Sequence, residues 1–269
     1  MARLHPLAIW SLVRELQMAA EDDRFVAVAG ARALADTLRR ELARGGDPRY
    51  VRDGPVEDAA VVVYVAAGDV DEELLRRAHR AKVPVVALAD RDVPYVLPTD
   101  VVPLRQGQGF PIPELARAIA RKLGERATPL AANLPALRRE VCAELVRDFS
   151  RKNGLVGAAV FIPGVDLPVL TLNQLRLVLR IAAAYGEEVD ASRLPEILGV
   201  IGGALGWRAV ARELLDFVPV AGWAVKGAVA YAGTRAVGEA AVRYFDARSG
   251  GPGGHVVTQP PASAARAGR

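Results

Sequence analysis

One stretch of the sequence has the spacing of a phosphate-binding loop. Residues Gly30–Thr37 follow an apolar, strand-like run, Phe25–Ala29, and lead into a helical pattern. Compared with the pattern G-x-x-x-x-G-K-[ST], the segment keeps the first glycine and the hydroxyl residue, but Ala35 replaces the second glycine and Asp36 replaces the lysine. The segment therefore has the frame of a phosphate loop without the residue that binds the phosphate charge.

Asp36 changes the chemistry that this loop could perform. A working loop needs inward-facing backbone N–H groups, a lysine on the phosphates and a hydroxyl on Mg²⁺. Gly30 could supply part of the turn and Thr37 the hydroxyl. A carboxylate about 4 Å from a phosphate charge costs roughly 4 kcal/mol at an effective dielectric of about 20, where a lysine would contribute about as much favourably. The sequence therefore predicts no ordinary triphosphate binding and no cofactor. The alternative is a plain strand-to-helix turn with Asp36 solvated in the first helical turn, where the macrodipole favours it.

Two later segments stand at the places of other GTPase motifs. Asp92 has the position of the aspartate in Asn-Lys-x-Asp, with Ala89 and Asp90 in place of the asparagine and lysine. Leu104–Gly109 is similar to the closing Ser-Ala-x-x-Gly-x-Gly loop without its Ser-Ala pair. In its overall order this half of the chain resembles the bacterial translation-factor-like GTPases, which implies a pseudo-GTPase that has lost nucleotide chemistry. The vestigial nucleotide site then comprises Gly30, Asp36, Thr37 and Asp92.

Patterns of other enzyme classes are absent from the sequence. It contains no H-E-x-x-H, C-x-x-C or G-x-S-x-G, and its three histidines are scattered. Asp90 and Asp92 could together bind a cation, but a polar turn after a buried strand is the simpler explanation for both residues. We therefore expect no catalytic residue and no metal site, and interpret the protein as not an enzyme.

Charge and cysteine content indicate the kind of partner and the cellular compartment to expect. The 35 basic and 31 acidic residues give a net charge of +4, and the basic excess is spread along the chain instead of forming blocks. A spread excess attracts phosphate only weakly, so no nucleic-acid partner is expected. Cys142 is the only cysteine and has no intramolecular disulfide partner. We therefore expect a reduced, cytoplasmic setting, and Met1–Glu21 shows no signal-peptide layout.

The order of elements predicts an α/β domain over residues 24–124. Strand-like runs such as Ala59–Ala67 alternate there with amphipathic helical patterns such as Ile112–Leu123. This order predicts a doubly wound, mostly parallel sheet, and the resemblance adds that it is P-loop GTPase-like. Before this domain, residues 1–23 carry apolar side chains at helical spacing, which predicts an N-terminal amphipathic helix lying on it.

Beyond residue 124 the composition changes. Residues 125–135 are predicted to form a linker. Residues 136–246 are rich in Gly, Ala, Val and Leu without strand-like alternation, which predicts an all-α hydrophobic helical domain. Residues 247–269 consist largely of Gly, Pro, Ala and Ser and are predicted to be a disordered tail, because they hold too little apolar mass to fold.

Asn153–Gly186 carries the strongest family signal in the chain. It contains Ile162-Pro163-Gly164-Val165-Asp166, then a helical pattern that includes Gln174-Leu175 and ends at Tyr185-Gly186. With these features the second half resembles the YcjF-like family of domains of unknown function, which are often attached to, or encoded with, bacterial GTPase domains. The resemblance implies a helical domain, frequently described as membrane-associated, with no established catalytic activity.

The segment Gly154–Leu175 raises the question of membrane contact. It holds one charged residue and is long enough to span about 30 Å of hydrocarbon. That residue, Asp166, costs roughly 2.5 to 3.5 kcal/mol at a bilayer centre, and Pro163 and Pro168 interrupt a helix. Two hypotheses stay open, a re-entrant hairpin and a soluble bundle in which Asp166 caps a helix. The residues proposed to contact lipid or a partner are Asp166, Arg176, Arg180, Trp207 and Trp223.

These observations favour a non-catalytic adaptor. In this hypothesis the pseudo-GTPase domain is a platform for a helical domain that docks on the inner face of the cell membrane, or on a GTPase or another protein partner, in the cytoplasm. One alternative is an unconventional nucleotide-binding enzyme that uses the Gly30 turn differently. The other is a soluble cytosolic interaction module whose apolar helices are simply core.

Overall fold

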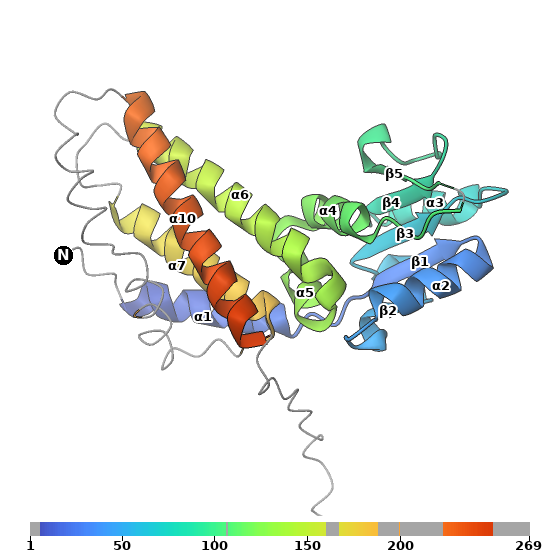
Figure 1. The fold of residues 1–269 in the computed structure, drawn as a ribbon, viewed down its shortest axis with the longest axis horizontal. Helices are drawn as coiled ribbons and strands as arrows, with labels where there is room; N and C mark the ends of the chain where they lie inside the picture. Colours follow the sequence, from blue (N-terminus) through green and yellow to red (C-terminus); the bar gives the residue numbers. More distant parts are fainter. Residues whose placement is uncertain (1–5, 106, 160–166, 188–198, 200–222, 250–269) are drawn as a thin grey trace, which may run out of the picture.

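The computed structural model describes residues 6–105, 107–159, 167–187, 199 and 223–249. A sheet of parallel strands lies at one end of the molecule, and a group of long helices lies at the other (Figure 1). The predicted α/β class with a parallel sheet is therefore confirmed.

Five strands form the sheet in the order β2-β1-β3-β4-β5, and every neighbouring pair is parallel. The strands are β1 (Val26–Gly30), β2 (Val51–Arg52), β3 (Val61–Val65), β4 (Val85–Ala89) and β5 (Val101–Pro103). Every residue of β3 and β4 is buried. Their near-continuous apolar sequences suit strands that are covered on both faces. The order is that of flavodoxin-like doubly wound sheets, whose topological switch point lies between β1 and β3.

Helices cover both faces of this sheet. Leu38 of α2 and Ile119 of α4 share one apolar cluster with Val63, whereas Leu75 of α3 shares another with Tyr64. Successive strand residues point to opposite faces, so Val63 and Tyr64 belong to different layers. The helices of this part are α2 (Arg32–Leu42), α3 (Glu72–Arg80) and α4 (Ile112–Leu123). Short 3-10 turns complete the connections: η1 (Pro48–Tyr50), η2 (Val56–Asp58) and η3 (Pro98–Asp100).

The segment predicted to be a linker, residues 125–135, is instead part of the packed core. It forms most of η4 (Gly124–Ala127) and all of α5 (Thr128–Asn133), and both Leu130 and Ala131 are buried. Pro129 lies in the first turn of α5, where a missing N–H costs nothing, so the proline begins a helix here instead of interrupting one. One apolar cluster continues from the sheet through α4 and α5 into the long helices.

Three long helices make up the second part: α6 (Pro135–Ala159), α7 (Leu167–Ala184) and α10 (Trp223–Ser249). Helices α6 and α10 run side by side in opposite directions, since Val146 lies next to Gly238 and Gly157 next to Ala230 (Figure 1). A Cβ added to Gly157 would lie only 2.8 Å from the Ala230 Cβ, so glycine lets the two backbones approach closely. Helix α10 continues to Ser249, past the predicted start of the tail at residue 247.

The N-terminal helix does not lie where the sequence analysis placed it. Helix α1 (Pro6–Ala20) packs on α7 and α5 of the helical part and not on the α/β domain. Leu12 and Leu16 of α1 form a small buried cluster with Leu175 and Leu179 of α7. The prediction of an amphipathic helix was correct. Such a pattern indicates that one face of the helix is buried, but it does not identify the surface on which that face packs.

Some residues that were predicted to contact the membrane lie outside the described ranges. They are Asp166, Trp207 and the middle of the segment Gly154–Leu175. The two ends of that segment form the last turns of α6 and the first half of α7. Among the described helices, none is both long enough and apolar enough to cross a bilayer.

Candidate functional site

The connection from β1 to α2 is a tight turn and not a loop. Strand β1 ends at Gly30 and α2 begins at Arg32, so only Ala31 lies between them. The Ala31 N–H donates a hydrogen bond to the Val65 carbonyl oxygen at 3.0 Å. A phosphate loop needs several backbone N–H groups arranged around the anion, and one connecting residue cannot provide them.

Gly30 is required by this turn for a structural reason. Its φ is +101°, and a Cβ at this position would lie 2.2 Å from the Val65 carbonyl oxygen. Any other residue would meet both backbone strain and a collision with β3. The glycine that matched the phosphate-loop pattern therefore holds β1 close to β3.

Asp36 and Thr37 lie in the second turn of α2. The alternative of a plain strand-to-helix turn had placed Asp36 in the first turn. Asp36 forms an ion pair with Arg39 one turn further along the helix. The Thr37 hydroxyl donates a hydrogen bond to the Ala33 carbonyl oxygen at 3.0 Å and accepts one from Arg40 at 3.1 Å. Both side chains are thus engaged along α2, away from its N-terminus, and neither faces a phosphate position.

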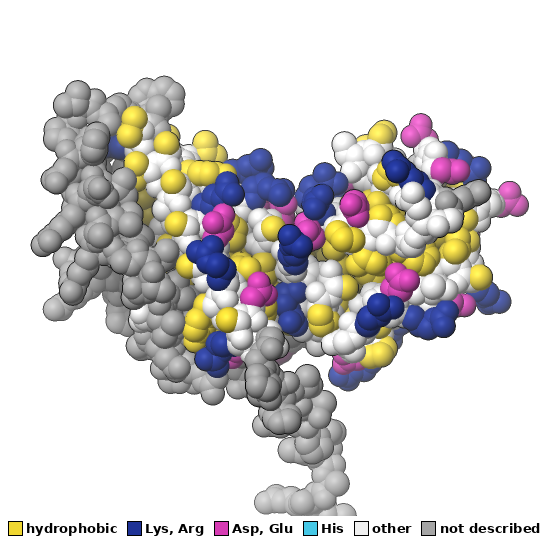
Figure 2. All heavy atoms as spheres, in the orientation of Figure 1, with side chains coloured by type: hydrophobic (Ala, Val, Ile, Leu, Met, Phe, Trp, Pro, Cys, Tyr) yellow, Lys and Arg dark blue, Asp and Glu magenta, His cyan; other side chains and the backbone are white. Residues whose placement is uncertain are grey.

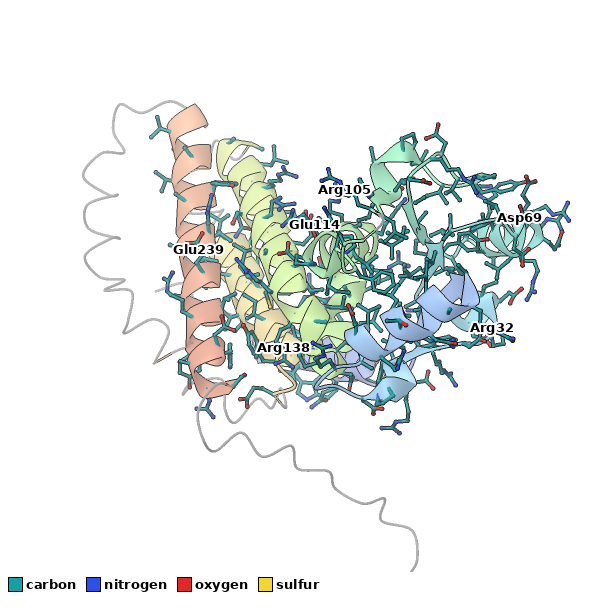
Figure 3. All side chains as sticks on the ribbon, turned by 45° about the vertical axis from the view of Figure 1, so that its right-hand side comes forward. Arg32, Asp69, Arg105, Glu114, Arg138 and Glu239 are labelled. Atoms are coloured by element: carbon teal, nitrogen blue, oxygen red, sulfur yellow. The ribbon has the colours of Figure 1, made fainter. Side chains whose placement is uncertain are left out.

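A hollow of about 320 Å³ lies at the carboxyl ends of β1 and β3. This is the topological switch point of the sheet, where ligands of open α/β folds bind. Arg32 at the start of α2 and Asp69 after β3 both lie at this end of the molecule (Figure 3). The polar residues that line the hollow are Arg32, Arg39, Asp53, Tyr64, Asp69 and Asp71. Gly30 is also in its wall, whereas Asp92 lies exposed in the loop after β4 and does not line it.

Two of the acidic groups in this hollow already serve the local structure. Asp71 caps α3, where its Oδ1 accepts a hydrogen bond from the Leu74 N–H at 3.0 Å. The Asp71 N–H donates to the hydroxyl of buried Tyr64 at 2.7 Å. Asp53 lies 3.9 Å from the Arg39 guanidinium, which also holds Asp36.

The hollow can hold a polar ligand but contains few side chains that could act in catalysis. Carboxylates outnumber guanidiniums in its wall, so it does not favour a phosphate. No histidine or cysteine lines it. Over the described ranges of the chain, no three His, Cys, Asp or Glu side chains come together in a way that could hold a metal ion.

Arg176 and Arg180, proposed to contact lipid or a partner carboxylate, bind carboxylates of the chain itself. Glu15 of α1 pairs with both of them. Arg180 is only 8% exposed, and its Nε also lies 2.7 Å from Glu125. Burial alone would raise the pKa of Glu125, but the hydrogen bond from Lys152 and the charge on Arg180 outweigh it and hold that pKa below its usual value. Trp223 begins α10, but its side chain is not described.

A buried polar network, which no sequence pattern predicted, joins the three long helices. The side-chain amide of Asn153 in α6 donates to the Thr234 hydroxyl of α10 at 2.8 Å. Asn173 of α7 donates in turn to the Asn153 side-chain oxygen at 2.8 Å. Both Asn153 and Thr234 are completely buried. The available signal was a set of uncharged polar residues on otherwise apolar helices, which need partners when buried.

Comparisons of the chain with protein-family models, curated proteins and solved structures gave no match. The assignment of a function therefore rests on the geometry described above.

Proposed function

We propose that the protein is a non-catalytic adaptor: a GTPase-derived α/β domain without nucleotide chemistry, joined to a YcjF-like helical domain that docks on the inner face of the cell membrane or on a protein partner. The observation that carries this proposal is the one-residue turn between β1 and α2. It leaves no loop to surround a triphosphate, and Asp36 and Thr37 are engaged along the helix. The GTPase ancestry is supported by the order of the remnant motifs around Gly30 and Asp92.

The continuous core supports the role of the α/β domain as a platform. One apolar cluster runs from the sheet into α6, α7 and α10, and Arg117 of α4 pairs with Glu140 of α6 at 2.9 Å. A platform needs such a rigid joint, because a docked helical domain transmits its position to the sheet only through fixed contacts. The helical part also exposes apolar side chains where α6 ends and α7 and α10 begin, namely Leu155, Val169 and Val225.

Calorimetric titration with GTP and Mg²⁺ tests the nucleotide half of the proposal. We expect no binding at concentrations up to about 1 mM, which corresponds to less than about 4 kcal/mol of affinity. Asp36→Lys should not create binding, because residue 36 lies in the second turn of α2. Micromolar affinity that falls on Thr37→Ala would overturn the proposal in favour of a nucleotide-binding enzyme.

Cell fractionation without detergent tests the docking half. A docked protein should sediment with membranes and be released by detergent. Protein that stays in the supernatant would count against the membrane, and purification of the tagged chain would then identify a protein partner. If neither membrane nor partner is recovered, the adaptor role fails, even if nucleotide binding is absent.

A further inference from the structure

The face shared by α6 and α10 carries a basic groove that none of the functions above uses. Its volume is about 420 Å³. Figure 2 shows Lys and Arg side chains over these two helices. The charged and polar side chains that matter for its chemistry are Arg139, Arg147 and Ser150 of α6 and Arg235, Glu239 and Arg243 of α10.

The arginines form two rows on opposite walls of the groove. Arg139 and Arg147 lie about 12 Å apart along α6, and Arg235 and Arg243 lie about 12 Å apart along α10, at roughly 1.5 Å per residue. The helices are antiparallel, with Val146 next to Gly238, so Arg139 lies across from the last turns of α10 that carry Arg243. Arginines from both helices therefore line one groove.

Two of these four arginines are already held by carboxylates. Arg147 pairs with Glu144 at 2.5 Å, and Arg235 pairs with Glu239 at 2.7 Å. Glu239 lies in the space between α10 and α6 (Figure 3). Arg139 and Arg243 have no carboxylate within ion-pair distance in the part of the chain that the structure describes. Neighbouring positive charges without a counter-charge repel one another, so the end of the groove that carries Arg139 and Arg243 favours binding of an anion.

Ser150 lies towards the other end of the groove, about 16 Å from Arg139 along α6 at roughly 1.5 Å per residue. It is completely buried, and its hydroxyl has no exposed surface and no hydrogen-bond partner among the described residues. A ligand held between Arg139 and Arg243 therefore does not depend on this hydroxyl.

We propose that the α6–α10 groove binds a phosphate-bearing ligand, with its anionic group between Arg139 and Arg243. A phosphate offers three oxygens and more than one negative charge, so it can engage guanidiniums from both walls at once. The groove is larger than one phosphate and suits a ligand that extends along the helices. The phosphate can belong to a soluble compound or to the headgroup of an anionic lipid. This inference goes beyond the adaptor role, since binding of a soluble phosphate compound needs neither a membrane nor a partner.

The first experiment measures binding of inorganic pyrophosphate to the full chain by calorimetry in low salt. Arg139→Gln combined with Arg243→Gln should weaken it by at least about tenfold, as expected for the loss of charge-assisted hydrogen bonds. The matched control is Arg44→Gln combined with Arg80→Gln, which removes the same charge from exposed positions on the α/β part and should change affinity by less than about twofold.

Vesicle sedimentation identifies the source of the phosphate. Binding to phosphatidylglycerol vesicles that is lost in the Arg139/Arg243 variant, without binding of pyrophosphate, assigns the groove to lipid headgroups. Pyrophosphate binding that the same variant loses assigns it to a soluble compound. The proposal is overturned if the wild type binds neither probe, or if the variant binds as well as the wild type.

Discussion

Glu15 of α1 and Arg180 of α7 form an ion pair between residues 165 positions apart, with 2.9 Å between Oε1 and Nη2. Arg180 is almost completely buried and reaches Glu125 with its Nε. One guanidinium therefore lies between a carboxylate from the first helix and one from the turn before α5. The pair fixes α1 on the helical part in addition to the apolar contacts of Leu12 and Leu16.

Glu15→Gln should lower the free energy of unfolding by about 1 to 2 kcal/mol. The loss is smaller than for a fully buried pair, because Glu15 is 44% exposed and Arg180 keeps Glu125 as a partner. Urea unfolding checks the prediction. Glu21→Gln, at an exposed position just beyond α1, is the control and should change stability by less than about 0.5 kcal/mol. Equal effects of the two substitutions would mean that the pair does not hold α1.

The lowered pKa of Glu125 predicts a pH dependence of stability. In the folded protein the Lys152 hydrogen bond and the Arg180 charge outweigh the effect of burial, so the pKa lies below the usual value of 4.5. A carboxyl whose pKa is lower when folded stabilises the protein above its unfolded pKa, and this contribution disappears as the pH falls through the folded pKa. The contribution of Glu125 to stability should therefore be constant above about pH 4.5 and decrease below it.

Glu125→Gln removes this contribution and is the test. Urea unfolding at about pH 7 and about pH 3.5 should show a smaller loss on acidification for Glu125→Gln than for the wild type. The Glu21→Gln control should retain the wild-type difference. An unchanged pH dependence in Glu125→Gln would show that other carboxylates, such as Asp22 and Asp47, account for the acid sensitivity.

The glycines of the long helices predict opposite effects of the same substitution. A Cβ on Gly157 would lie 2.8 Å from the Ala230 Cβ and 3.1 Å from the Lys226 carbonyl oxygen, whereas one on Gly233 would meet nothing within 4 Å. Gly157→Ala should therefore destabilise the protein by about 1 to 3 kcal/mol through overpacking. Gly233→Ala should stabilise it by about 0.5 to 1 kcal/mol through helix propensity. Thermal unfolding of the two variants gives the comparison, and a loss of stability in both would contradict the assigned packing.

The α/β class was predictable because the two central strands have a clear sequence pattern. Strands β3 and β4 are apolar runs bounded by turns, and such runs become strands when both faces are covered. Strand β2 was missed because it has only two residues, Val51 and Arg52, which pair with the start of β1. The packing of residues 125–135 was also missed, because composition alone cannot show that a short segment with two prolines fills the joint between two cores.

The candidate site was less predictable than the fold. Motif spacing aligned Asp36 with the lysine of a phosphate loop, but spacing does not show where a helix begins, and α2 begins at Arg32. The partners of Arg176 and Arg180 could not be found locally, because Glu15 lies on a helix more than a hundred residues earlier. The basic groove needs the antiparallel contact of α6 and α10, which only the tertiary structure supplies.

Cys142 should be unreactive in the folded protein. It lies in α6 with no exposed surface, and burial raises the pKa of its thiol to about 12. At about pH 8 only about one thiol in ten thousand would then be ionised, and the thiolate is the reactive form. Alkylation by iodoacetamide should be at least about a hundredfold slower in buffer than in urea. The control is a chain in which Cys142→Ala is combined with Ser249→Cys, at the exposed end of α10, which should react quickly in buffer. The residual rate of Cys142 then measures local opening of α6, and labelling as fast as at position 249 would mean that this core is not closed.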